Sequence, residues 1–184
     1  KTKENKYTYI NDKLVNEYGQ SVMMGWERPI MKRVSEILTQ TKGDVLNIGH
    51  GMGIVDGFIQ ELNPRSHSII EIHPDIQQKM LRNNWDLKPN VNLYFGSWVD
   101  FLDELPLMDG IFFDTLETHE FVDFISIAWK YLKPGGVFTF FNNNMSSPEN
   151  EIFQPLIKDI ILENYDVSVK TVLVHNADID LSLI

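Results

Sequence analysis

The chain has 184 residues, 43% hydrophobic and 23% charged, which fits one globular domain with a sizeable core rather than a disordered segment. It contains no cysteine, which excludes disulfides and thiolate metal sites and fits a reducing intracellular compartment. The formal net charge of −10 argues against a broad nucleic-acid surface, although an acidic surface also serves solubility alone. No apolar run approaches the roughly 20 residues of a membrane span, so we expect neither a nucleic-acid nor a membrane partner.

In chain order, a polar and irregular N-terminal arm (1–20) precedes a main domain (21–184) in which strand-like and helical patterns alternate. This alternation is typical of βαβ units and predicts an α/β fold with a central, mostly parallel sheet and helices on both faces. The predicted strands are Asp44–Gly49, Ser68–Ile72, Val91–Gly96, Gly110–Thr115 and Gly136–Phe141, and a further alternating segment runs from Tyr165 to His175. The predicted helices are Met23–Gln40, Gly53–Leu62, Pro74–Asn83, Glu117–Tyr131 and Pro148–Glu163.

Three glycines, Gly49, Gly51 and Gly53, follow the first predicted strand of the sheet. In open parallel sheets, ligands bind at the carboxyl ends of strands, where glycines let the backbone approach them. The dinucleotide fingerprint requires its third glycine where this chain has Ile54, and no Gly-Lys-Ser/Thr ending is present. NAD and a triphosphate loop are therefore disfavoured, and a structural turn without a ligand is the alternative interpretation.

Glu71 ends the second predicted strand, where a carboxylate can accept hydrogen bonds from both ribose hydroxyls of a ligand. Together with the G-x-G-x-G spacing and the KPGG sequence before the fifth strand, this pattern resembles the class I S-adenosylmethionine-dependent methyltransferases. The resemblance implies a Rossmann-like fold, S-adenosylmethionine as cofactor and S-adenosylhomocysteine as product. The five histidines have no metal-binding spacing, so no metal site is expected.

Six segments narrow the resemblance to two related families, guanidinoacetate N-methyltransferase and the fungal-type protein arginine N5-methyltransferase, also called the δ-methyltransferase. These segments are VMMGWERPIM, NIGHGMGIVDGFIQ, IIEIHPD, GSWVDF, GIFFDT and KPGGVFTFFN. The first three and the FFN end are closer to the arginine enzyme, whereas WE-x-P and THEF occur in similar form in the guanidinoacetate enzyme. The resemblance implies the catalytic domain of a longer, cytoplasmic protein, with the nucleus as a second location, and it predicts no oligomeric state.

Both families methylate a guanidine nitrogen, which has no free lone pair while the group is protonated. Two carboxylates can hold the planar group by paired hydrogen bonds, and one can accept its proton. The resemblance assigns these roles to Glu27 and Asp114, and implies methyl transfer to the δ nitrogen of arginine residues in a protein substrate. Two alternatives stay open: guanidinoacetate methylation, whose carboxylate needs a cation such as Arg28, Lys130 or Lys133, and a non-catalytic cofactor-binding scaffold.

The resemblance also implies positions for the ligands. Around the methionine part and ribose of the cofactor it places Gly49, His50, Gly51, Met52, Gly53, Ile54 and Glu71, and it counts Asp114 among the cofactor contacts. Along the adenine it places Ile72, His73, Ser97 and Trp98, with Met23 and Met31 closing over it from one helix face and Tyr7 as a lid. Against the substrate it places Glu27, Asp114, His119 and Asn142. Plain roles are the alternatives for five of these: core packing for Met23 and Met31, a helix start for His73, a solvated position for His119 and a turn for Asn142.

Overall fold

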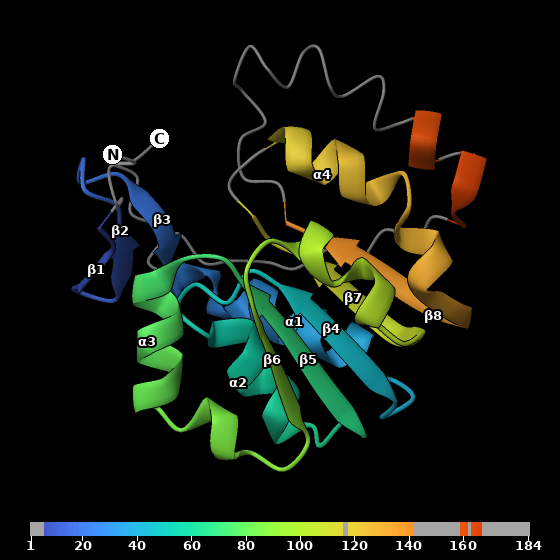
Figure 1. The fold of residues 1–184 in the computed structure, drawn as a ribbon, viewed down its shortest axis with the longest axis horizontal. Helices are drawn as coiled ribbons and strands as arrows, with labels where there is room; N and C mark the ends of the chain where they lie inside the picture. The colour runs from blue at the N-terminus through green and yellow to red at the C-terminus, as the bar shows by residue number, and fades with distance from the viewer. Residues whose placement is uncertain (1–5, 116–117, 142–158, 162, 167–184) are drawn as a thin grey trace.

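A five-stranded parallel sheet forms the centre of the computed structural model, which describes residues 6–115, 118–141, 159–161 and 163–166. The strand order is β6-β5-β4-β7-β8 (Figure 1). The bounds are β4 (Asp44–Ile48), β5 (Ser66–Glu71), β6 (Val91–Phe95), β7 (Met108–Phe113) and β8 (Leu132–Phe140). This arrangement confirms the predicted α/β class, and each of the five strands overlaps its predicted range.

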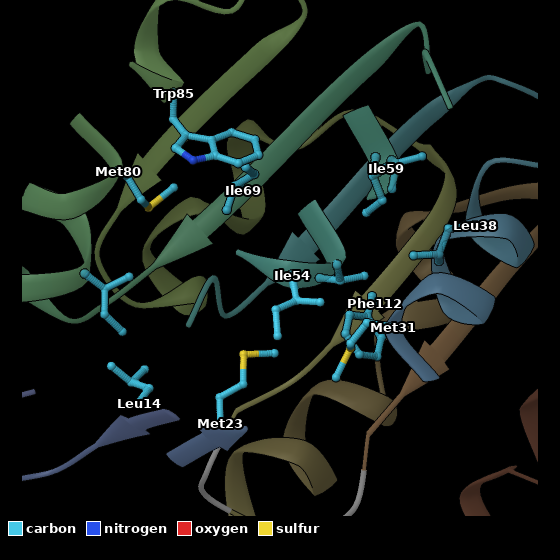
Figure 2. Close-up of a cluster of buried hydrophobic side chains, with 13 residues drawn as sticks. Leu14, Met23, Met31, Leu38, Ile54, Ile59, Ile69, Met80, Trp85 and Phe112 are labelled. Atoms are coloured by element: carbon cyan, nitrogen blue, oxygen red, sulfur yellow. The ribbon is translucent and has the colours of Figure 1, made fainter. Parts of the chain in front are cut away.

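The two faces of the sheet bury separate apolar clusters, because successive side chains of a strand point to opposite faces. Val45, Ile69 and Phe112 belong to the first cluster, which Figure 2 shows, whereas their neighbours Leu46 and Ile70 belong to the second. The first face is covered by α1 (Arg28–Leu38), α2 (Ile54–Glu61), α3 (Pro74–Arg82) and η2 (Trp85–Leu87). The second face is covered by η3 (Trp98–Glu104), α4 (Thr118–Ile125) and η4 (Ala128–Tyr131). Burial on both faces explains why the strands read as continuous apolar runs.

The N-terminal segment forms a three-stranded antiparallel sheet, so the prediction of an irregular arm is wrong. Its strands are β1 (Thr8–Ile10), β2 (Lys13–Val15) and β3 (Ser21–Met24). The predicted helix from Met23 is also wrong at its start, since a 3-10 turn, η1 (Gly25–Glu27), separates β3 from α1. Met23 instead pairs with Leu14 across the small sheet, and Pro29 occupies the first turn of α1, where proline is favoured.

The small sheet contacts the turn after β4 that holds Gly49, Gly51 and Gly53, called the glycine turn below. It also contacts α3, beside which it lies in Figure 1. The Tyr9 hydroxyl donates to the Gly51 carbonyl oxygen at 2.9 Å, and the Lys79 ammonium lies 2.8 Å from the centre of the Tyr9 ring. The Tyr7 backbone N–H donates to an Asp75 carboxylate oxygen at 3.0 Å. These contacts place the N-terminal segment at the carboxyl edge of the central sheet.

Two boundaries after β7 differ from prediction. The predicted helix over 117–131 divides into α4 and η4, because the Ser126 hydroxyl and the Trp129 indole bond the carbonyl oxygens of Asp123 and Ser126, respectively. The KPGG sequence lies inside β8, where the pairing with β7 is irregular and Gly135 has φ +77°.

Most of the predicted helix 148–163 and strand 165–175 lies outside the described residues. No helix in the described ranges is both long and apolar enough for a membrane span.

Candidate active site

A cavity of about 920 Å³ lies at the carboxyl ends of the parallel strands. The ends of β4, β5, β6 and β7 line it with Ile48, Gly49, Ile70, Glu71, Ile72, Gly96, Ser97, Asp114 and Thr115. The chain leaves β4 for α2 on one face and β7 for α4 on the other, so the strands separate at a topological switch point. Open parallel sheets bind small molecules at this point, and the cavity volume is in the range of such sites.

The glycine turn after β4 depends on glycine for steric reasons. Gly49 has φ +98°, and a Cβ atom there would lie 2.0 Å from the carbonyl oxygen of Asp114. Gly53 has φ +74° as the residue before α2, and its Cβ atom would lie 2.7 Å from the His50 ring. Only glycine lets the turn pack against β7 on one side and over the His50 ring on the other.

Glu71 is held by the backbone at the end of β5, with 4% of its surface exposed. One carboxylate oxygen accepts the His50 N–H at 2.8 Å, and the other accepts the His73 N–H at 2.7 Å. The oxygen bonded by His50 also accepts the Gly51 N–H at 3.4 Å, so the oxygen bonded by His73 is the one that keeps an acceptor site for a ligand. The carboxylate is therefore oriented before any ligand binds.

Asp114 follows β7 and lines the cavity, and its backbone N–H donates to the Ile48 carbonyl oxygen at 2.9 Å. Burial raises its pKa to about 8, and the negative charges of Glu27 and Asp56 contribute to the shift. Glu27, at the end of η1, is 3% exposed, and burial raises its pKa to about 7 although its carboxylate accepts the Met24 N–H at 3.0 Å. The structure thus brings together two carboxylates, from distant parts of the chain, that are stronger bases than ordinary ones.

Five other predicted cofactor residues line the cavity: Tyr7, Ile72, His73, Ser97 and Trp98. The Tyr7 and His73 rings stack, with centroids 3.9 Å apart and planes 7° from parallel. His73 also caps α3, where its ring nitrogen accepts the Asp75 N–H at 3.2 Å, so the helix-start role and the cavity position both apply. The buried Trp98 Nε1 has no hydrogen-bond partner among the described residues.

Several other predicted residues lie behind the cavity wall rather than on it. Met31 is fully buried in the cluster with Phe112 (Figure 2). Met23 is 5% exposed, and its sulfur lies 3.2 Å from the Met52 nitrogen. The prediction that the two methionines share one helix face is therefore wrong, and both pack in the core. Glu27, His50, Met52, Gly53 and Ile54 also lie outside the lining. The backbone of His119 lies in α4 with its side chain outside the described part, and Asn142 lies outside the described residues.

The lining also includes residues that the sequence analysis missed: Lys6, Asp75, Gln78, Thr115 and Glu120. Thr115 directly follows Asp114, and Glu120 follows His119, so proximity to predicted site residues was the available signal. The described lining residues include four carboxylates, those of Glu71, Asp75, Asp114 and Glu120, and one lysine, Lys6. This balance suits a cationic ligand. No cluster of three or more His, Asp or Glu side chains in the described ranges could hold a metal ion.

The guanidinoacetate N-methyltransferase family model matches residues 2–169, which is most of the chain. The chain belongs to this family. It is also similar to proteins named protein arginine N-methyltransferase 2, at 40% identity over 90% of the chain for the Candida glabrata protein and 40% over 73% for the Saccharomyces cerevisiae protein. The chain covers 42% and 36% of those two relatives, so it spans less than half of their length.

A solved structure supports the fold independently. The precorrin-6y C5,15-methyltransferase of Geobacter metallireducens superposes with a TM-score of 0.58 over 76% of this chain and 68% of that one, at 18% identity. At this identity the likeness concerns the fold alone. The family membership and this likeness confirm both the class I methyltransferase fold and the predicted family resemblance.

Proposed function

We propose that the protein transfers a methyl group from S-adenosylmethionine to the δ nitrogen of arginine residues in a protein substrate. The observation that carries the proposal is the pair of carboxylates, Glu27 and Asp114, whose raised pKa values suit them to take up a proton. The names of the relatives favour arginine in a protein as the acceptor. A cytoplasmic location, with the nucleus as a second one, is part of the proposal and can be checked by imaging a tagged protein.

The lining residues fit S-adenosylmethionine in three respects. Gly49 and Gly51 expose backbone beside Glu71, whose oriented carboxylate can accept a hydrogen bond from the ribose. Ile72 and Trp98 offer apolar surface to the adenine. The acidic lining suits a positively charged sulfonium. When bound, the cofactor supplies an electrophilic methyl group.

The two catalytic carboxylates would orient the substrate and remove its proton. An arginine guanidinium has a pKa above about 12, so it enters the cavity protonated. Its positive charge favours the ionised forms of Glu27 and Asp114, which can then hold the planar group by paired hydrogen bonds. One nitrogen is thereby pointed at the methyl group, and Asp114 accepts the proton on a carboxylate oxygen as the nitrogen lone pair becomes available.

Guanidinoacetate is the less favoured acceptor, because its carboxylate would need a cation inside the cavity. Arg28 is half exposed and pairs with Asp12 at 2.5 Å. Lys133 bonds Asp44 and Asp109 at 2.7 Å each, and these carboxylates lie at the opposite, amino end of the sheet. Among the described lining residues, only Lys6 could serve. A non-catalytic scaffold is disfavoured because it would have no use for two carboxylates with pKa values raised to about 7 and 8.

The proposal is tested with isotopically labelled S-adenosylmethionine, supplied in parallel with a protein extract and with guanidinoacetate. The expected result is label on protein, with mass-spectrometric fragments that place the methyl group on the δ nitrogen of arginine. Label on guanidinoacetate alone would move the protein to the creatine-forming branch. Label on neither, with cofactor binding intact by calorimetry, would favour the scaffold.

A further inference from the structure

A buried polar cluster lies beneath the glycine turn, outside the cavity lining. Its centre is the Asp56 carboxylate, in the first turn of α2, with none of its surface exposed. Around it lie Asn47 from β4, His50 from the glycine turn and His67 from β5, each at most 5% exposed. A fully buried carboxylate is costly unless it is well bonded, so this cluster calls for an explanation.

The Asp56 carboxylate is bonded by all three neighbours. The Asn47 amide nitrogen lies 2.9 Å from both carboxylate oxygens, His50 Nδ1 lies 2.6 Å from one and His67 Nε2 lies 2.8 Å from the other. Burial opposes ionisation, but the charge and hydrogen bond of His50, with those of His67, outweigh it and hold the pKa of Asp56 below its usual range. Asp56 is therefore a fixed acceptor at the base of the turn.

Two of these three contacts continue into the glycine turn. The amide nitrogen of Asn47 also donates to the Gly49 carbonyl oxygen at 3.0 Å. His50 bonds Asp56 with its side chain, and its backbone N–H donates to Glu71 at 2.8 Å. His50 thus connects the buried Asp56 carboxylate, through its side chain, with the Glu71 carboxylate at the cavity, through its backbone N–H.

The third contact, from His67, does not lead to the turn. His67 bonds Gln60 of α2 through its other ring nitrogen at 3.0 Å. The Trp85 ring meets the rings of His50 and His67 edge-on, with centroids 5.1 Å and 6.2 Å away. His50 and His67 therefore have similar burial and the same two neighbours, and they differ in whether they reach Glu71. This difference provides a matched control.

We propose that Asp56 is a positioning residue for cofactor binding. Through Asn47 and His50 it fixes the glycine turn so that the His50 N–H holds Glu71 in its binding orientation. The His50 side chain accordingly acts from inside the protein and not by touching the cofactor. This inference rests on the proposed binding of S-adenosylmethionine in the cavity.

The test compares Asp56→Asn, which keeps the shape and removes the charge, with His67→Gln, which removes a bond to the same carboxylate on the side away from the turn. His50→Leu is a second variant on the turn side, in case Asp56→Asn folds poorly. For each variant we would measure the Kd of S-adenosylmethionine by calorimetry, the Tm, and kcat and KM with the protein substrate.

At about pH 9, where Asp114 is ionised with or without the Asp56 charge, Asp56→Asn and His50→Leu should raise Kd and the KM of the cofactor about tenfold, with kcat within about threefold, as expected for loss of a binding geometry. His67→Gln should lower Tm by about as much as Asp56→Asn does, because both lose a hydrogen bond of the same carboxylate, and it should leave Kd within about twofold. Unchanged affinity for S-adenosylmethionine in the first two variants, or an equal loss of affinity in His67→Gln, would overturn this inference and leave the proposed function standing. Failure of the unsubstituted chain to bind S-adenosylmethionine would overturn the proposed cofactor and this inference with it.

Discussion

Glu71 and Asp114 occupy equivalent places on either side of β4, at the ends of β5 and β7, yet their surroundings differ. Backbone N–H groups of His50 and His73 hold both oxygens of Glu71. The Asp114 carboxylate accepts no hydrogen bond from the described residues and lies in the field of Glu27 and Asp56, which adds to the effect of burial on its pKa. The same chemical group is thus prepared for binding on one side of β4 and for proton uptake on the other.

This difference predicts that substitutions at Asp114 and at Glu71 impair different steps. A change on the Asp114 side should reduce the rate of the chemical step, and a change on the Glu71 side should reduce affinity for the cofactor. Four predictions follow from this division, each with its own measurement.

Asp114→Asn should have the largest effect, because it removes the carboxylate that accepts the proton. We expect kcat to fall by about two to four powers of ten, with the Kd of S-adenosylmethionine changed by less than about threefold. Single-turnover kinetics and calorimetry measure the two quantities. Asp103→Asn, an exposed position on η3, is the control. Normal turnover in Asp114→Asn would remove the proposed base.

Glu27→Gln should have the next largest effect, since the amide loses one arm of the paired hydrogen bonds to the guanidinium. We expect kcat/KM for the protein substrate to fall by about one to three powers of ten. Steady-state assays over substrate concentration measure it, with the exposed Glu61→Gln on α2 as control. Equal values for Glu27→Gln and Glu61→Gln would place Glu27 in a structural role.

Glu71→Ala should weaken cofactor binding by about ten- to a hundredfold and leave kcat at saturating cofactor within about threefold. The reason is that the proposed ribose acceptor is lost while the Asp114 side is untouched. Titration calorimetry measures the affinity, and Asp86→Ala, exposed in η2, is the control. A kcat loss as large as that of Asp114→Asn would abolish the division of roles.

The pH dependence of activity and of stability tests the raised pKa values without any substitution. Because both carboxylates must be ionised, kcat/KM should rise about a hundredfold per pH unit below the Glu27 pKa of about 7, about tenfold per unit between it and the Asp114 pKa of about 8, and then level off. Stability should change in the opposite sense, since folding raises the Asp114 pKa from 3.8. The folded chain then binds the extra proton, and this stabilisation is complete below pH 3.8 and is lost as pH rises through about 8.

Asp114→Asn separates this stability effect from other titrations. Its Tm should fall less between pH 6 and pH 9 than that of the unsubstituted chain, by a few degrees, since 1 kcal/mol corresponds to roughly 2–4 °C for a domain of this size. Thermal unfolding followed by circular dichroism measures the difference. Identical pH profiles of Tm would show that Asp114 has an ordinary pKa.

The sequence predicted the central sheet well because continuous apolar runs and glycine turns are local signals. It placed Gly49, Glu71 and Asp114 at strand ends, and parallel topology then brings those ends together. It failed for Met23, because a methionine-rich segment fits a helix as readily as a strand, and only the pairing with Leu14 decides. The pairing joins segments that no local pattern connects.

The interior of the site was less accessible from sequence. His50 was expected to meet the cofactor, but its side chain turns toward Asp56, a direction set by tertiary contacts with α2 and β5. Polar residues at Asn47 and Asp56, within otherwise apolar runs, were the available signal, since buried polar groups require partners. The pKa shifts were equally inaccessible, because they depend on the burial and proximity of distant segments.

The most direct test of the different roles of Glu71 and Asp114 is a carbon-13 NMR titration of the aspartate and glutamate side-chain carboxyls. The structure predicts a carboxyl that titrates at about 8 and disappears from the spectrum in Asp114→Asn. Titration of Asp114 at its ordinary value of 3.8 would contradict the account, because Asp114 would then be no better prepared for proton uptake than any carboxylate in water.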